Sequence, residues 1–115
     1  MKKPKREIIL DTETTGLSFA NGDRIIEIGC VELLDRVPSG NNLQIYFNPE
    51  TKKVSEEAIK VHNINNEFLK KQSFFRDRAE EILKFLSNDN LVIHNAKFDI
   101  GFLNNEFNIC NMPAI

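Results

Sequence analysis

The chain has 115 residues, 41% of them hydrophobic and 28% charged, which is the size and balance of one compact globular domain. Its formal net charge of −2 argues against a passive nucleic-acid-coating protein, and no apolar run approaches the roughly 18 residues of a membrane span. Cys30 and Cys110 form no CxxC pair, so we expect two reduced thiols in a cytoplasmic protein rather than a zinc or redox site.

The first half of the chain predicts three strands. Residues 7–13 form a buried pattern that turns polar at its end, and residues 24–34 are rich in residues that favour β structure. The sequence Pro-Ser-Gly-Asn-Asn at 38–42 predicts a turn. A third strand should follow at residues 43–47, where apolar side chains alternate. Together these strands form an antiparallel meander.

The second half of the chain predicts mainly helices. Ser55 is expected to cap a helix that ends at His62, and Asn65 or Asn66 a further single turn. An amphipathic helix is predicted where apolar residues recur at helical spacing, at Phe75, Ala79, Ile82, Leu83 and Leu86.

A short buried strand at residues 91–94 and a helix from residue 96 or 97 complete the pattern. A meander followed by helices and a further strand predicts a single α/β domain over residues 1–115. The helical connection permits the last strand to join the mixed sheet in parallel.

Two acidic residues stand at the end of the first predicted strand. Asp11 and Glu13 are two positions apart, so their side chains should share one face, roughly 7 Å apart along the strand. Two such carboxylates repel each other unless a cation lies between them, and hard oxygen ligands favour Mg²⁺ or Mn²⁺. An isolated Asp-x-Glu would be read as two solvated acids. The small residues that follow, Thr14 to Gly16, let a ligand approach closely.

The hexamer Asp-Thr-Glu-Thr-Thr-Gly at 11–16 resembles the first motif of the DnaQ-like superfamily of 3′→5′ exonucleases, and Asn-Ala-Lys-Phe-Asp at 95–99 resembles the second. The similarity covers about residues 6–108, including Arg-Ile-Ile-Glu-Ile-Gly at 24–29 and Val-His-Asn-Ile at 61–64. It is strongest to the proofreading exonucleases of bacterial DNA polymerase III. The resemblance implies a ribonuclease H-like fold that releases nucleoside monophosphates from a DNA 3′ end with two divalent cations, Mg²⁺ or Mn²⁺.

The resemblance also implies roles for individual residues. Those expected to ligate metal are Asp11, Glu13 and Asp99, although a helix dipole also favours an acid at position 99. Those expected to bind the terminal nucleotide are Thr14, Thr15, Gly16 and Leu17, the last as an apolar wedge against the base. His62, Asn95 and Phe98 are further candidates for the substrate groove. For His62, a structural role at a helix end explains the residue equally well.

The family's third motif, which carries a fourth acidic ligand and a histidine base, has no counterpart here. No acidic residue follows Glu106 and no histidine follows His94. The resemblance therefore implies a C-terminally incomplete domain that is nearly inactive alone and prone to self-association, with activity restored by the missing segment.

The partners implied are a single-stranded or frayed DNA 3′ end and the DNA polymerase III core subunits, with no membrane. Two alternatives stay open from the sequence. One is an RNA-trimming exonuclease of the same fold, and the other is a catalytically incomplete, polymerase-associated fragment.

Overall fold

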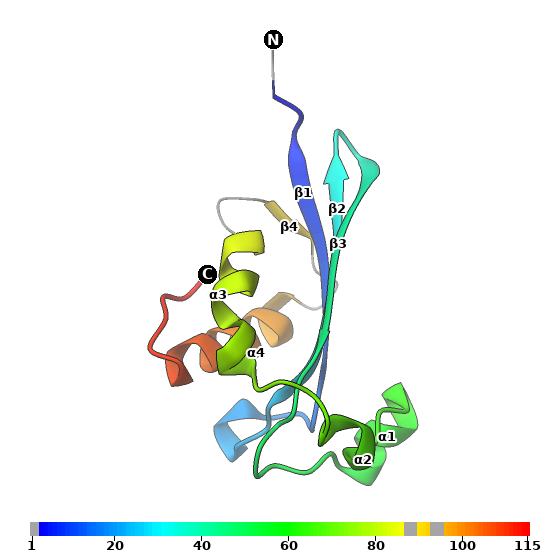
Figure 1. Ribbon diagram of the computed structural model, residues 1–115, viewed down its shortest axis with the longest axis vertical. Coiled ribbons are helices and arrows are strands. Elements are labelled where there is room, and N and C mark those ends of the chain that lie inside the picture. Colours follow the sequence, from blue (N-terminus) through cyan, green and yellow to red (C-terminus); the bar gives the residue numbers. More distant parts are fainter. Residues whose placement is uncertain (1–2, 87–89, 93–95) are drawn as a thin grey trace.

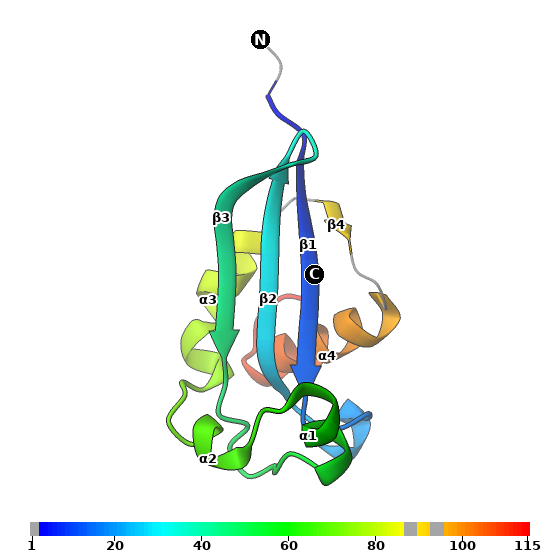
Figure 2. The same cartoon turned by 90° about the vertical axis from the view of Figure 1, so that its right-hand side faces the viewer.

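A four-stranded sheet with the strand order β3-β2-β1-β4 is the centre of the fold. The structure is a computed structural model that describes residues 3–86, 90–92 and 96–115. Its strands are β1 (Arg6–Thr14), β2 (Ile25–Leu34), β3 (Val37–Tyr46) and β4 (Asn90–Val92). The first three form an antiparallel meander and β4 adds to β1 in parallel, as the sequence predicted (Figures 1 and 2).

The helices lie on one face and at one end of this sheet. Figure 1 shows α3 (Phe75–Leu86) and α4 (Ala96–Ile109) on the same side of the strands, with α1 (Glu56–His62) and α2 (Asn66–Leu69) at the end where β1 stops. A short 3₁₀ helix, η1 (Phe19–Asn21), follows β1 and was not predicted. None of the helices in the described part of the chain has the length and apolarity needed to span a bilayer.

Local capping explains why the small helices begin where they do. The Ser55 side chain accepts a hydrogen bond from the Ala58 N–H, and the Asn65 side chain accepts one from the Phe68 N–H. Each contact satisfies a backbone donor that has no partner within the helix. Both predicted caps are confirmed, and the choice between Asn65 and Asn66 is settled in favour of Asn65.

The β2–β3 turn corrects one prediction. The turn residues are Asp35 and Arg36, which both have positive φ angles, of 50° and 69°, whereas residues 38–42 lie inside β3. Positive φ at two successive residues suits the right-handed twist of a two-residue hairpin. The Asp35 carboxylate accepts a hydrogen bond from the Lys5 N–H at 2.8 Å, which fixes the turn beside the start of β1.

Burial alternates along β1 and separates its two faces. Ile8, Leu10 and Thr12 are buried, whereas Ile9 and Asp11 are exposed. The buried side of the sheet meets α3 and α4 in a core rich in phenylalanine, whose largest buried rings are Phe47, Phe75, Phe102 and Phe107. Burying such a side chain stabilises the fold by about 1.5–3 kcal/mol. This core holds α4 against the sheet.

The fourth predicted strand is present as β4. β4 spans Asn90–Val92 and pairs in parallel with residues 7–9 of β1. Residues 93–95, which include His94 and Asn95, lie outside the described residues. The helix predicted from residue 96 or 97 is confirmed as α4.

Candidate active site

Asp11 and Glu13 lie near the carboxyl end of β1, on the face turned away from α3 and α4. Asp11 pairs with Gly29 of β2, and Glu13 pairs with Glu27. Asp11 is exposed and Glu13 is half-buried. The predicted sharing of one strand face is therefore confirmed, because the residue between them, Thr12, is buried on the opposite side.

Asp99 reaches the same strand from the first turn of α4. It is only 4% exposed, and its carboxylate accepts a hydrogen bond from the Thr12 hydroxyl. The structure therefore brings the acid of the second motif to the strand that carries the first, against the residue between Asp11 and Glu13. Within residues 3–86, 90–92 and 96–115, no three acidic, histidine or cysteine side chains lie close enough together to enclose a metal ion.

The electrostatics of this strand end are those of crowded carboxylates. Burial raises the pKa of Glu13, and the negative charges of Asp11, Glu27 and Asp99 raise it further, while His62 lowers it. A cation placed here would relieve that repulsion. The donor set, carboxylate oxygens only, is the set that Mg²⁺ and Mn²⁺ prefer. The residues present therefore fit a divalent cation chemically.

The loop after β1 is built around Asp23. The Asp23 carboxylate accepts a hydrogen bond from the Thr15 hydroxyl at 2.8 Å and one from the Ser18 N–H at 3.1 Å. Gly16 is required at this point, since a Cβ there would lie 2.6 Å from an Asp23 oxygen. Sequence reasoning missed Asp23, because an acid beside a glycine before a strand looks like ordinary turn chemistry.

Thr15 is hydrogen-bonded within the loop through its side chain and its backbone. Its side chain is 0% exposed, and its hydroxyl also accepts a hydrogen bond from the Arg24 N–H at 3.0 Å. Its backbone N–H donates to the Arg24 carbonyl, and its carbonyl accepts from the Ser55 N–H. These contacts tie Thr15 into the loop, and its predicted contact with the terminal nucleotide stays a prediction. The Thr14 hydroxyl likewise donates to the Gly16 carbonyl, at 2.6 Å.

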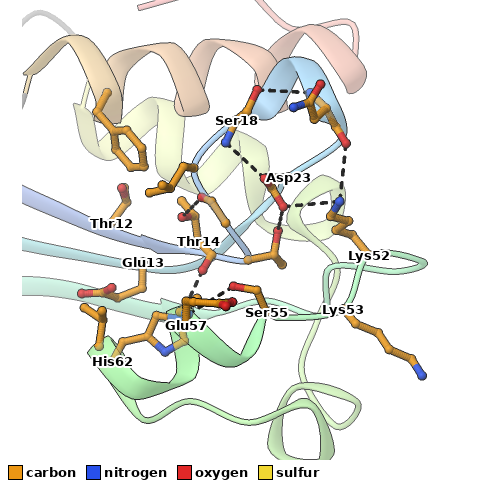
Figure 3. Close-up of a pocket in the computed structure, with 17 residues that line it drawn as sticks. Thr12, Glu13, Thr14, Ser18, Asp23, Lys52, Lys53, Ser55, Glu57 and His62 are labelled. Atoms are coloured by element: carbon orange, nitrogen blue, oxygen red, sulfur yellow. Dashed lines mark hydrogen bonds and ion pairs between the residues drawn. The ribbon is translucent and has the colours of Figure 1, made fainter.

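A pocket of about 780 Å³ opens between this loop and α1 (Figure 3). Its volume falls within the roughly 300–1,000 Å³ of small-molecule sites. Leu17, 88% exposed, and Val61 are two exposed apolar side chains on its lining. Its lining consists of Thr12, Glu13, Thr14, Thr15, Gly16, Leu17, Ser18, Asn21, Asp23, Lys52, Lys53, Ser55, Glu57, Ala58, Val61, His62 and Phe98.

His62 connects the end of α1 to the end of β1. Its Nδ1 accepts a hydrogen bond from the Ile64 N–H at 3.1 Å. Its Nε2 therefore carries the proton in the neutral ring and donates to the Thr14 carbonyl at 3.2 Å. His62 lies at the end of α1, as the predicted alternative has it, but the carbonyl that it meets belongs to Thr14 of β1 and not to the end of the helix. The ring also lines the pocket.

The remaining candidates occupy different places. Phe98 lines the pocket and packs on Phe102, with the ring centroids 4.7 Å apart. Lys52 was not predicted. Its ammonium lies 3.5 Å from the Asp23 carboxylate, whereas Figure 3 shows Lys53 pointing away from the cluster. Asn95 lies outside the described residues.

Comparison with known proteins agrees with this geometry. The model of the exonuclease family RNase_T matches residues 8–114. DNA polymerase III subunit epsilon of Rickettsia prowazekii is 49% identical over 96% of the chain, and the subunit of the same name from Haemophilus influenzae is 43% identical over 97%. The chain spans about half the length of these relatives, 48% and 45% respectively.

Solved structures share the fold. A product-bound structure of exonuclease I superposes with a TM-score of 0.83 at 17% identity, over 96% of this chain and 27% of that one. An Escherichia coli exonuclease I–ssDNA complex superposes with a TM-score of 0.81 at 18% identity, over 94% of this chain and 24% of that one.

Proposed function

The chain belongs to the exonuclease family RNase_T, and from this premise we propose that it forms the catalytic half of a divalent-metal-dependent 3′→5′ DNA exonuclease that proofreads replication. The observation that carries the proposal is that Asp99 of α4 is hydrogen-bonded to Thr12, the β1 residue between Asp11 and Glu13, beside a pocket of about 780 Å³. The relatives named DNA polymerase III subunit epsilon support a role in replication.

We assign the three carboxylates of Asp11, Glu13 and Asp99 to holding the cations. Cations held by these residues would supply activation of a water and stabilisation of the charge on the attacked phosphate. The Thr12 hydroxyl donates a hydrogen bond to the Asp99 carboxylate and so ties it to the strand of the first motif. Both motifs thus contribute negative charge to one end of the sheet.

The loop around Asp23 receives the end of the DNA. Gly16 leaves room for the Asp23 carboxylate that fixes this loop, and Leu17 offers an apolar surface on which any base can stack. Stacking on a side chain does not distinguish bases, which suits an enzyme that must remove whichever nucleotide is misplaced. Phe98 and Val61 add apolar surface to the same pocket.

The expected partners are a single-stranded or frayed DNA 3′ end and the core subunits of DNA polymerase III, in the cytoplasm. This assignment follows the names of the relatives. The relatives are longer than the region that they share with this chain.

A degradation assay tests the activity and its substrate. Residues 1–115 would be joined to the part of the Rickettsia prowazekii relative that the match does not cover. This chimera would be given 5′-labelled single-stranded DNA or RNA with Mg²⁺ or Mn²⁺. We expect a ladder of DNA shortened one nucleotide at a time from the 3′ end. Faster shortening of RNA would favour the RNA-trimming alternative, and no shortening of either would reject the proposed activity.

A further inference from the structure

A buried ion pair links α4 to the segment that follows the active-site loop. Glu106 is 0% exposed, and its two oxygens accept hydrogen bonds from Arg24 Nη2 at 2.7 Å and Arg24 Nε at 2.8 Å. The Ile25 N–H donates a third, at 3.0 Å. The proposed reaction gives none of these groups a role.

Arg24 holds the first motif with its backbone while it holds α4 with its side chain. Its N–H donates to the Thr15 hydroxyl at 3.0 Å, and its carbonyl accepts from the Thr15 N–H at 2.9 Å. Its remaining guanidinium nitrogen, Nη1, reaches Glu50 at 3.1 Å, and Arg76 of α3 also pairs with Glu50. One residue thereby joins the motif loop to both helices behind the sheet.

Glu106 lies on the same face of α4 as Asp99. The buried residues Asp99, Phe102, Leu103 and Glu106 follow the spacing i, i+3, i+4, i+7, with an acid at each end of the apolar stretch. Apolar packing alone tolerates small shifts of a helix, whereas a two-pronged arginine–carboxylate contact is directional. A shift by one residue would move the helix about 1.5 Å and rotate it by about 100°. Such a shift would separate Asp99 from Thr12.

We propose that Arg24 and Glu106 are positioning residues that set the place of Asp99 relative to Asp11 and Glu13, and so tune the affinity of the site for divalent cations. The inference deepens the proposed function and rests on it, because it assumes that Asp99 ligates the metal. Glu106 touches no substrate or metal and acts through the axial position of α4.

A second buried pair in the same fold supplies a matched control. Arg6 pairs with Glu32, which also accepts a hydrogen bond from Ser39 at 2.7 Å. Both glutamates are buried and both pair with arginine. Glu32 stands opposite Ile8 in the β1–β2 register, whereas Ile25, next to Arg24, stands opposite Thr14 at the active-site end. Glu32→Gln therefore weakens a comparable pair without altering the support of α4 near the site.

The experiment is calorimetric titration of the 115-residue chain with Mn²⁺. We expect Glu106→Gln to weaken Mn²⁺ binding about 10-fold, the lower end of the range for residues that orient metal ligands. Arg24→Lys keeps the charge but loses the two-pronged contact, so it should also weaken Mn²⁺ binding. It replaces Glu106→Gln as the test if that variant does not fold. Glu32→Gln should leave the affinity within about twofold. A folded Glu106→Gln or Arg24→Lys protein that binds Mn²⁺ like the wild type would overturn the inference.

A metal-free readout separates this inference from the proposed function. In amide NMR spectra, Glu106→Gln should shift the resonances of Thr12 and Asp99, and Glu32→Gln should not. If these shifts occur but Asp99→Asn binds Mn²⁺ as tightly as the wild type, the metal role of Asp99 fails while the positioning of the helix stands. Unchanged resonances in Glu106→Gln would overturn the positioning itself.

Discussion

The Thr12 hydroxyl donates a hydrogen bond to the buried carboxylate of Asp99, and this contact joins the strand of the first motif to the helix of the second. We expect Thr12→Val, which keeps the shape of the side chain but removes the donor, to lower the free energy of unfolding by about 1–3 kcal/mol. Thr12→Ser keeps the hydroxyl and should lower the free energy of unfolding by less. Urea unfolding of the three proteins measures the difference. Equal losses for Val and Ser would show that the hydroxyl contributes nothing.

Gly16 and Gly29 offer a matched pair of substitutions. An added Cβ at Gly16 would lie 2.6 Å from an Asp23 oxygen, whereas at Gly29 it would meet nothing within 4 Å. We expect Gly16→Ala to destabilise the protein by about 1–3 kcal/mol through overpacking, and Gly29→Ala to change stability by less than about 0.5 kcal/mol. Thermal unfolding of both variants and the wild type measures the two changes in stability. A neutral Gly16→Ala would mean that the Asp23 contacts do not fix the loop.

Leu17 is 88% exposed, so its removal should affect binding rather than folding. Leu17→Ala should weaken the binding of a mononucleotide by about 1–3 kcal/mol if the side chain stacks on the base. Val37→Ala, at a side chain 63% exposed in β3, is the control and should not alter binding. Titration with deoxythymidine monophosphate in the presence of Mn²⁺ compares the two. Equal affinities would exclude Leu17 from the nucleotide site.

Glu32 makes the stability depend on acid pH. Hydrogen bonds from Ser39 and Arg6 lower the pKa of Glu32 below its ordinary 4.5. A lowered folded-state pKa contributes stability above the unfolded pKa, and that contribution is lost as the pH falls through the folded value. Glu32→Gln should therefore be less stable than the wild type at pH 7, with the difference shrinking at about pH 3. Urea unfolding of the wild type and of Glu32→Gln at the two pH values measures this difference. A difference independent of pH would contradict it.

The elements with strong periodicity could be predicted from the sequence. The strand at β1, the helix at α3 and the caps Ser55 and Asn65 follow from local patterns that the structure keeps. The hairpin turn could not be predicted. Glycine and asparagine at residues 38–42 indicate a turn there, whereas the two successive positive φ angles of the turn belong to Asp35 and Arg36.

The site was predictable only in part. The acids of the two motifs were found because they sit in recognisable strings. The support around them depends on contacts between distant residues, such as Arg24 and Glu106, which are 82 positions apart and leave no local pattern. Thr15 lies inside the first motif, and its burial and its hydrogen bond to Asp23 likewise could not be predicted from the motif string.

The rate of nucleotide release by the chimera described above tests the central claim, that Asp11, Glu13 and Asp99 form one metal-dependent site. Single-turnover shortening of 5′-labelled DNA would be measured for the parent and for Asp11→Asn, Glu13→Gln and Asp99→Asn. Because each change removes an anionic ligand, we expect each to slow release by about 100-fold or more while the protein stays folded. If any folded variant shortened DNA at the parental rate, that carboxylate would lie outside the site and the account of a shared cluster would be wrong.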